Sequence, residues 1–400
     1  MLLGVYDMKI NTLTIEGISR IKETLYLEFN PGMNIICGVN GTCKTTVLEC
    51  ITNLFSYGSS DNIKKNSLAL SGKCTATTNI HGKELITYKI NQFVPTEPDN
   101  RSLSGGNDTA KNLLYFKTSR GFMYKQLKAI PKDTVASNYD YAYAINRGIN
   151  FDDFKGWFVN RHLFSHIKEP GLTSHQLENL EVAKKCFSIL DNSISFAHVK
   201  SNTLDIMVNS QQGEIYFEYL SAGYKSCLYI LLGIIKEIEF RFDALTVDKF
   251  DGILLIDEVD LHLHPTWQTT IVRSLKETFP LAQIIVTTHS PHIIQSADPN
   301  EVIPLIIDEN GDVCVNKIET NEYGFKGWTV EEILQDVMGM NNVRSSVYLD
   351  AINTFDMALA SEDDVSAVRN YEVLNSMLHP SNPLRAVLDI RMAGVERDCD

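Results

Sequence analysis

The stretch Met33–Thr46, which reads MNIICGVNGTCKTT, constrains the possible fold more than any other part of the chain. An apolar run stops at Gly38, a turn-rich loop follows, and Lys44 opens a second apolar run with helical spacing. A loop between a strand and a helix holds phosphate groups because its backbone N–H groups point inward, the helix presents its positive end, and a lysine adds a full charge. The residues of the predicted nucleotide site are Asn40, Gly41, Thr42, Cys43, Lys44, Thr45 and Thr46.

Two residues of this loop have specific expected roles. Lys44 is expected to reach the β- and γ-phosphates of ATP, and Thr45 is expected to bind Mg²⁺. A lysine after a turn of small residues also occurs at an ordinary helix start. The motifs downstream favour the nucleotide site over that alternative.

The loop departs from the usual pattern at one position, because Cys43 stands where a glycine normally precedes the lysine. Glycine lets the backbone approach the phosphates closely, and a side chain crowds that approach. We therefore expect ATP binding to survive better than ATP turnover.

Two adjacent carboxylates end the buried run ILLIDE, residues 253–258. Ligands of open α/β sheets lie at the carboxyl ends of the strands. Asp257 is predicted to bind Mg²⁺, and Glu258 is predicted to be the general base that orients the attacking water. His289, at the end of the next predicted strand, is expected to contact the γ-phosphate. An acidic pair can also simply cap a helix, but its combination with the phosphate loop favours ATP hydrolysis.

The order of the elements predicts an α/β fold, because buried strands alternate with helices. Helical spacing at about 138–192 predicts an insertion between the phosphate loop and the later motifs. Antiparallel strands are predicted at 8–18, 23–29, 73–80 and 84–93, and further strands at 252–256, 283–287 and 301–307. These features predict an ATPase domain at 1–320 and an acidic helical region at 321–400.

Charge limits what the chain binds. The formal net charge is −14, and residues 321–400 hold 14 Asp and Glu against 6 Lys and Arg, a net charge of −8, so this region is not a nucleic-acid clamp. Between Lys111 and Lys132, basic residues alternate with aromatic ones and no acid occurs. Such a stretch suits nucleic-acid contact, and a sheet edge with solvated lysines is the alternative.

The sequence predicts a cytoplasmic protein that does not enter a membrane. No apolar run approaches the roughly 20 residues of a membrane span, and the start MLLGVYD lacks the basic flank of a signal peptide. The eight cysteines include no C-x-x-C pair and are expected to be reduced thiols. Residues 1–7 precede the first predicted strand and receive no function.

The segment Leu220–Gly223, LSAG, precedes a long apolar helix. Alone, it predicts a helix that begins after Ser221 as its N-cap. Beside the other motifs, it resembles the signature of ATP-binding-cassette (ABC) ATPases, whose serine and glycine contact the γ-phosphate held by the opposite protomer. The resemblance implies that Ser221 and Gly223 bind nucleotide across a homodimer or higher oligomer, and that Asp260 lies in the loop crossing this interface.

The motif order resembles the RecF, SMC and overcoming-lysogenization-defect group of ABC-type ATPases. This implies an ATPase head with a P-loop α/β core, an antiparallel β-subdomain, a helical insertion and a C-terminal helical tail. Five segments are similar to the ATPase of Septu and Septu-like retron anti-phage systems, the PtuA type: LLYFKTSRG (113–121), NFDDFKGWFVNRH (150–162), LSAGYKS (220–226), LLIDEVDLHLHPTWQ (254–268) and GWTVEEILQDVMGM (327–340).

This resemblance implies a partner HNH nuclease of the PtuB type, which the ATPase binds and restrains. The acidic tail is the candidate docking surface, and solvated helices explain it equally well. The alternative function is that of a RecF-like DNA-repair ATPase that clamps DNA without a dedicated nuclease.

Overall fold

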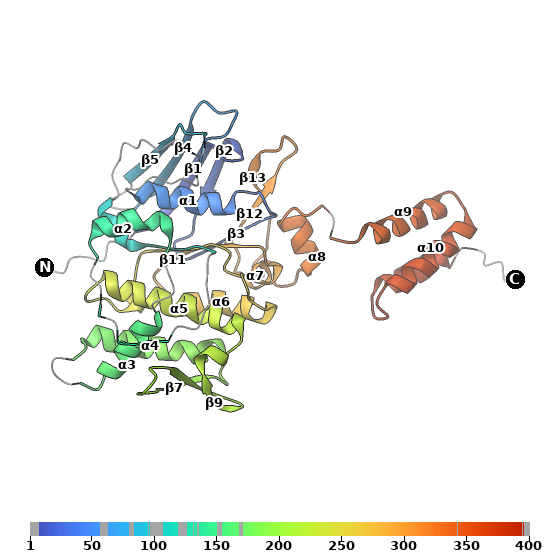
Figure 1. Ribbon diagram of the computed structural model, residues 1–400. Helices are drawn as coiled ribbons and strands as arrows, with labels where there is room; N and C mark the ends of the chain where they lie inside the picture. The colour runs from blue at the N-terminus through green and yellow to red at the C-terminus, as the bar shows by residue number, and fades with distance from the viewer. Residues whose placement is uncertain are drawn as a thin grey trace. The chain divides into compact units, whose positions relative to one another are not determined.

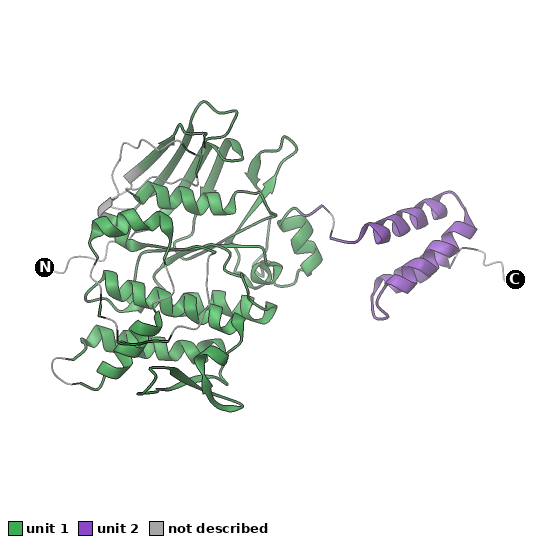
Figure 2. Ribbon diagram, in the orientation of Figure 1, with its two compact units in different colours: residues 1–339 green, residues 340–400 purple. Residues whose placement is uncertain are grey.

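The computed structural model describes residues 8–56, 63–79, 84–94, 96, 107–118, 126–130, 132–133, 136–149, 154–167, 171–341, 343–393 and 395. Contacts divide the chain into two compact units, Met1–Gly339 and Met340–Asp400, which are coloured separately in Figure 2. The first seven residues lie outside the described part.

A six-stranded sheet forms the centre of the first unit (Figure 1). Five neighbouring strands are parallel, and only the edge strand β13 is antiparallel to its neighbour β12. Most residues of these strands are apolar and buried, because helices or a second sheet cover both faces. Their spatial order is β13 (Val313–Val315), β12 (Val302–Ile307), β3 (Met33–Cys37), β11 (Gln283–Thr288), β10 (Ile253–Ile256) and β6 (Leu113–Phe116).

Alternate side chains of the central sheet enter two different cores. In β6, Leu113 and Tyr115 pack into the core that contains α1 (Lys44–Phe55), whereas Leu114 and Phe116 pack into the core on the other face. This sheet, with its alternating helices, confirms the predicted α/β fold. The position of β6 at the sheet edge agrees with the edge alternative for the basic stretch.

An antiparallel sheet covers the α1 side of the first unit. Helix α1 contacts both this sheet and the central one, and Figure 1 shows it between the two. The antiparallel strands, in spatial order, are β2 (Ile21–Glu28), β1 (Ile10–Ile18), β4 (Gly72–Thr78) and β5 (Glu84–Ile90).

Helices cover the opposite face of the central sheet. Helix α5 (Ala222–Arg241) is mostly apolar and is buried on most of its sides. The predicted helical insertion contains α3 (Phe154–Phe164) and α4 (Ser174–Leu190), and both helices pack against α5. The other helices of this unit are α2 (Asn138–Ala144), α6 (Pro265–Thr278), α7 (Pro291–Ser296) and α8 (Val330–Glu332), with short turns at Asn107–Asn112, Ile145–Arg147, Phe217–Tyr219, Val247–Lys249 and Ile333–Val337.

A small antiparallel sheet precedes α5. Its strands are β7 (Ser195–Val199), β8 (Ile206–Ser210) and β9 (Gly213–Tyr216), and α4 packs on β7. The chain passes from β9 through the turn Phe217–Tyr219 directly into the N-terminus of α5. The small sheet therefore sets where the signature segment begins.

Residues 325–338 belong to the first unit. The sequence instead predicts a separate region that begins at 321. Phe325, Ile333 and Met338 form an apolar cluster with Cys37 at the end of β3 and Ile294 in α7. The second unit begins after Gly339 and has its own small core on the helices α9 (Ser346–Ala360), α10 (Asp364–Met377) and α11 (Leu384–Met392). Of the helices in the described ranges, none has an apolar stretch sufficient to span a bilayer.

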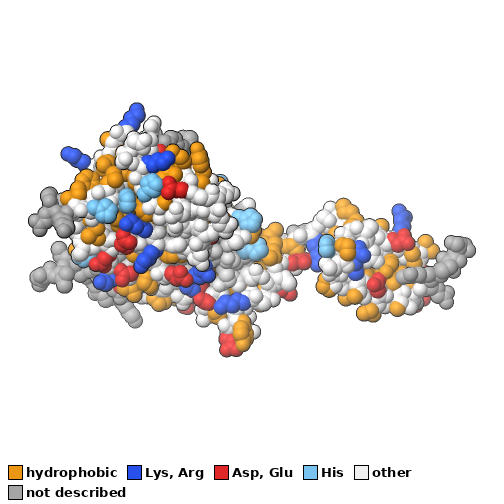
Figure 3. All heavy atoms as spheres, turned by 90° about the horizontal axis from the view of Figure 1, so that it is seen from below, with side chains coloured by type: hydrophobic (Ala, Val, Ile, Leu, Met, Phe, Trp, Pro, Cys, Tyr) orange, Lys and Arg blue, Asp and Glu red, His pale blue; other side chains and the backbone are white. Residues whose placement is uncertain are grey.

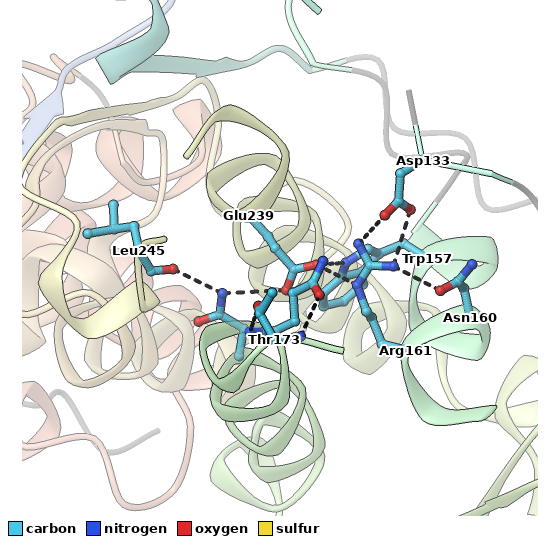
Figure 4. Close-up of polar contacts among 9 residues, drawn as sticks. Asp133, Trp157, Asn160, Arg161, Thr173, Glu239 and Leu245 are labelled. Atoms are coloured by element: carbon cyan, nitrogen blue, oxygen red, sulfur yellow. Dashed lines mark hydrogen bonds and ion pairs between the residues drawn. The ribbon is translucent and has the colours of Figure 1, made fainter. Parts of the chain in front are cut away.

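A buried ion pair joins the helical insertion to α5 (Figure 4). Arg161 Nε donates to Glu239 Oε1 at 2.6 Å, and Trp157 Nε1 donates to the same oxygen at 2.9 Å. The side chains of Arg161 and Glu239 are 2% and 4% exposed, and burial raises the pKa of Glu239. On its outer side, Arg161 also pairs with the more exposed Asp133. The three helices α3, α4 and α5 share this pair, because Asn179 of α4 donates to the second oxygen of Glu239.

We expect Arg161→Met to lower the free energy of unfolding by about 3–5 kcal/mol, because it leaves the Glu239 carboxylate buried without its cation. Urea unfolding followed by tryptophan fluorescence measures this change. The double variant Arg161→Met/Glu239→Gln should lose less stability, since no buried charge remains. A single variant as stable as the parent protein would show that the pair contributes nothing.

Candidate nucleotide site

The phosphate loop connects β3 to α1, and its backbone needs glycine at Gly38. That residue has φ of 145°, and a Cβ built there would lie 2.1 Å from the carbonyl oxygen of Leu305 in β12. Gly41 also has a positive φ, of 84°. Both glycines therefore have backbone conformations that disfavour other residues, and at Gly38 a side chain would also clash with Leu305.

Lys44 is buried, and its ammonium group lies across the loop. Its Nζ donates to the carbonyl oxygens of Gly38 and Val39, both at 2.9 Å. Burial lowers the pKa of Lys44, and the carboxylates of Asp257, Glu258 and Asp260 oppose this shift. The lysine is therefore held inside the loop by backbone oxygens, with acidic side chains nearby.

Asp257 joins the start of α1 to the ends of two parallel strands. Thr45 Oγ1 donates to Asp257 Oδ1 at 3.1 Å and to Oδ2 at 3.0 Å. Thr287 Oγ1, at the end of β11, donates to Asp257 Oδ1 at 2.6 Å. The threonine hydroxyl and the carboxylate are hard oxygen ligands of the kind that Mg²⁺ prefers.

The donor set of this pair fits a magnesium ion that is shared with a nucleotide. Mg²⁺ is usually bound by one or two carboxylates together with substrate phosphates and water. Among the described residues, no group of three or more His, Cys, Asp or Glu side chains could hold a metal by itself. Thr45 and Asp257 would hold Mg²⁺ together with phosphate oxygens and water.

Glu258 follows Asp257 in a left-handed backbone conformation, with φ of 46°. Such a conformation costs a non-glycine residue roughly 1–2 kcal/mol. Here it is held by a hydrogen bond of 2.7 Å from the backbone N–H of Glu258 to Thr287 Oγ1. The turn separates the two carboxylates, because Asp257 is 3% exposed whereas Glu258 is only partly buried.

Asp260 and His289 lie at the same edge of the sheet. Asp260 Oδ1 accepts hydrogen bonds from Thr288 Oγ1 at 2.7 Å and from the backbone N–H of His289 at 3.3 Å. Burial and the charge of Lys44 lower the pKa of His289, against the opposing effect of the nearby carboxylates. Burial and Lys44 therefore favour the neutral imidazole, which can donate one hydrogen bond and accept another.

Cys43 has φ of 62° and ψ of 23°, a left-handed conformation that glycine adopts without strain. Its side chain packs against the core of the antiparallel sheet. Burial raises the pKa of the thiol, opposed by hydrogen bonds with the backbone of Arg20 and Ile21 and with the side chain of Thr46. The left-handed backbone explains why a glycine is usual at the position of Cys43. In this chain the thiol of Cys43 lies against the β1–β2 turn.

Ser221 and Gly223 occupy the first turn of α5. Ser221 Oγ accepts from the backbone N–H of Tyr224 at 3.3 Å, which confirms the predicted N-cap, and Ser221 is exposed. A Cβ at Gly223 would lie 3.3 Å from Trp267 and 3.4 Å from the carbonyl oxygen of His262. Within the described ranges, no hydrogen bond joins Ser221 to the phosphate loop, so its contact with nucleotide stays a prediction.

Two residues near the loop have no counterpart in the sequence predictions. Arg20, in the β1–β2 turn, places Nη1 3.2 Å from where a Cβ of Gly41 would lie, so its guanidinium group lies over the phosphate loop. Thr287 holds both Asp257 and the backbone of Glu258. The role of Thr287 could have been predicted from the two threonine hydroxyls at the end of β11. The position of Arg20 could not, because it lies in a hairpin turn far from the phosphate loop in the sequence.

The basic stretch is only partly described. Lys111 and Lys117 lie over the rings of Phe242 and Tyr115, while Lys128 and Lys132 are exposed. Arg120 and Lys125 lie outside the described residues. On the face seen in Figure 3, basic and acidic side chains are interspersed. Nucleic-acid contact by this stretch therefore stays a prediction.

Comparisons with known proteins show which families this chain resembles. Residues 12–154 match the family "AAA domain", and residues 136–295 match "AAA domain, putative AbiEii toxin, Type IV TA system". The Septu protein PtuA of Bacillus thuringiensis is 47% identical over 393 residues, which cover 96% of this chain and 98% of that protein. The probable ATPase of retron Vc95 from Vibrio cholerae is 38% identical over 74% of this chain and 73% of that protein.

Solved structures are less similar. The SMC head domain from Thermotoga maritima is 16% identical, covers 78% of this chain and 100% of that one, and has a TM-score of 0.42. That score is too low for comparing individual site residues.

We expect Cys43→Gly to raise ATP affinity or turnover several-fold, because glycine adopts the left-handed conformation without strain and removes a side chain from the loop. Cys43→Ala is the matched control, since alanine removes the thiol but keeps the strained backbone, and it should show no gain. Calorimetric binding and steady-state hydrolysis measure the two effects. Equal values for the parent protein and Cys43→Gly would mean that the cysteine is neutral.

Proposed function

Since this chain belongs to the Septu PtuA family of anti-phage defence ATPases, we propose that it dimerises around ATP and thereby regulates a partner HNH nuclease. The observation that carries the proposal is the joined arrangement of Lys44, Thr45, Asp257 and Glu258 at the carboxyl edge of one parallel sheet. A positive charge, a candidate metal-binding pair and a candidate general base are then present in one place, as phosphoryl transfer to water requires.

Each side chain has one task in the proposed reaction. Lys44 exchanges its bonds to backbone oxygens for bonds to the β- and γ-phosphates. Thr45 and Asp257 hold Mg²⁺, which neutralises charge on the phosphate oxygens when bound. Thr287 keeps the Asp257 carboxylate in place through its 2.6 Å hydrogen bond.

Glu258 accepts a proton from the attacking water in this proposal. The left-handed turn moves its carboxylate out of the line of β10, and the hydrogen bond to Thr287 fixes the direction of that turn. In this proposal the imidazole of His289 donates a hydrogen bond to the γ-phosphate or to the water. A positioned general base of this kind contributes typically 10²- to 10⁴-fold in rate.

The exposed signature segment supports dimerisation around ATP. Ser221 and Ala222 are exposed at the N-terminus of α5, a 20-residue helix whose positive end favours an anion. In this proposal a second copy of the chain, with ATP in its own phosphate loop, provides such an anion.

The second unit is the proposed docking site for the nuclease. Its helices α9, α10 and α11 enclose a small core, while Met357, Val365 and Ile390 are 71%, 80% and 75% exposed. Apolar side chains exposed on a small unit of this kind are available to a protein partner. The HNH class of that partner is proposed from the family resemblance.

We expect Glu258→Gln to bind ATP and accumulate as a dimer, because the amide cannot accept the proton while Lys44 and Asp257 remain. Molar mass by light scattering, with and without ATP, measures the dimer, and phosphate release measures turnover. Lys44→Ala is the control that should lose ATP binding, since it removes a charge-assisted contact of about 1.5–3 kcal/mol. Hydrolysis at the parent rate by Glu258→Gln would exclude Glu258 as the base.

We expect deletion of residues 340–400 to leave ATP binding unchanged and to release the nuclease, because the site lies entirely in the first unit. The deletion begins at 340, since Phe325, Ile333 and Met338 are part of the first unit's core. Co-purification of the nuclease with each form measures the interaction. Retention of the nuclease by the shortened chain would place its binding surface on the ATPase unit.

A further inference from the structure

A second buried ion network lies at the other end of α3, beside the signature segment. Lys155 Nζ lies 2.8 Å from Asp205 Oδ1 and 2.5 Å from Glu218 Oε1. The side chains of Lys155 and Asp205 are 7% and 5% exposed, and that of Glu218 is 18% exposed. One lysine of the helical insertion therefore binds two carboxylates that are largely buried.

The two carboxylates belong to the segments that lead into α5. Asp205 precedes β8 of the small sheet, and Glu218 lies in the short turn Phe217–Tyr219. Only two residues separate Glu218 from Ser221, the N-cap of α5. The position of the Glu218 side chain therefore limits where the signature segment can lie.

Two further contacts fix this turn. Lys225, in the first turn of α5, donates from Nζ to the carbonyl oxygen of Glu218 at 2.8 Å. The ring of Phe154, next to Lys155, packs edge-on against Phe217, next to Glu218, with centroids 5.8 Å apart. Helix α3 thus holds the turn through adjacent polar and apolar contacts.

We propose that Lys155 is a positioning residue, which sets the segment Glu218–Ser221 so that the exposed serine meets the γ-phosphate bound by a second copy of the chain. The dimer part of this inference rests on the function proposed above, whereas the ordering of the segment does not. The helical insertion then acts on the composite ATP site, although it contributes no residue to the phosphate loop.

If Lys155 only stabilised the fold, replacing it would lower the free energy of unfolding and have no specific effect on the segment Glu218–Ser221. The matched control is therefore Arg161→Met, which removes the other buried cation of the same helix. Arg161 pairs with Glu239, 18 residues beyond Ser221 in the sequence, and with Asp133. Lys155→Arg tests rescue by charge, and Glu218→Gln is a milder variant that keeps the size of the side chain.

The first measurement is hydrogen exchange of the amides of residues 219–226 in the full chain without nucleotide. Lys155→Met should speed exchange there at least tenfold, Glu218→Gln should do so more weakly, and Lys155→Arg should stay near the parent rate. Arg161→Met should leave this segment unchanged. Unchanged exchange in Lys155→Met, or an equal increase in Arg161→Met, would overturn the proposal.

The second measurement is ATP-dependent dimerisation in the Glu258→Gln background. Lys155→Met should keep ATP affinity within about twofold while its dimer dissociation constant rises at least tenfold. Equal dimerisation with and without Lys155 would overturn its role toward the second copy. If Glu258→Gln itself remains monomeric with ATP, the proposed function fails, and the hydrogen-exchange result alone then decides whether Lys155 positions the segment.

Discussion

The hydrogen bonds between Thr45 and Asp257 join two segments that lie 212 residues apart in the sequence. One segment follows the phosphate loop, and the other ends the buried strand β10. The pair exists because parallel strands bring their carboxyl ends to one edge, where each strand passes into a loop or helix. Thr287 supplies a third strand end to the same carboxylate. The chemistry of the site therefore depends first on the order of strands in the central sheet.

Much of this arrangement was predictable because its signals are local. Continuous apolar runs mark the buried strands, and the turn residues at Gly38 and the carboxylates at Asp257 mark their ends. The helical insertion and the N-cap at Ser221 were predicted from spacing and residue type for the same reason. In each case the interaction that decides the structure lies within a few residues.

Other features depend on contacts between distant segments and were missed. The left-handed conformation of Glu258 is held by Thr287, and the position of Arg20 over the phosphate loop follows from the packing of a hairpin. Residues 325–338 have helical periodicity of their own, which suggested a tail, but their apolar side chains meet Cys37 and Ile294. Periodicity shows that a face is apolar, and it does not show which surface that face covers.

The close approach of Gly38 to Leu305 has a consequence for how the protein is made. Strand β3 lies between β11 and β12, both of which the ribosome adds about 250 residues after the phosphate loop. A growing chain that ends before residue 302 contains the whole phosphate loop but lacks β12, the strand against which Gly38 packs. Because domains generally fold as units during synthesis, we expect the phosphate loop to reach its folded conformation only after about three quarters of the chain has been translated. The nucleotide site is thus a late product of translation, although its best-known motif is translated first.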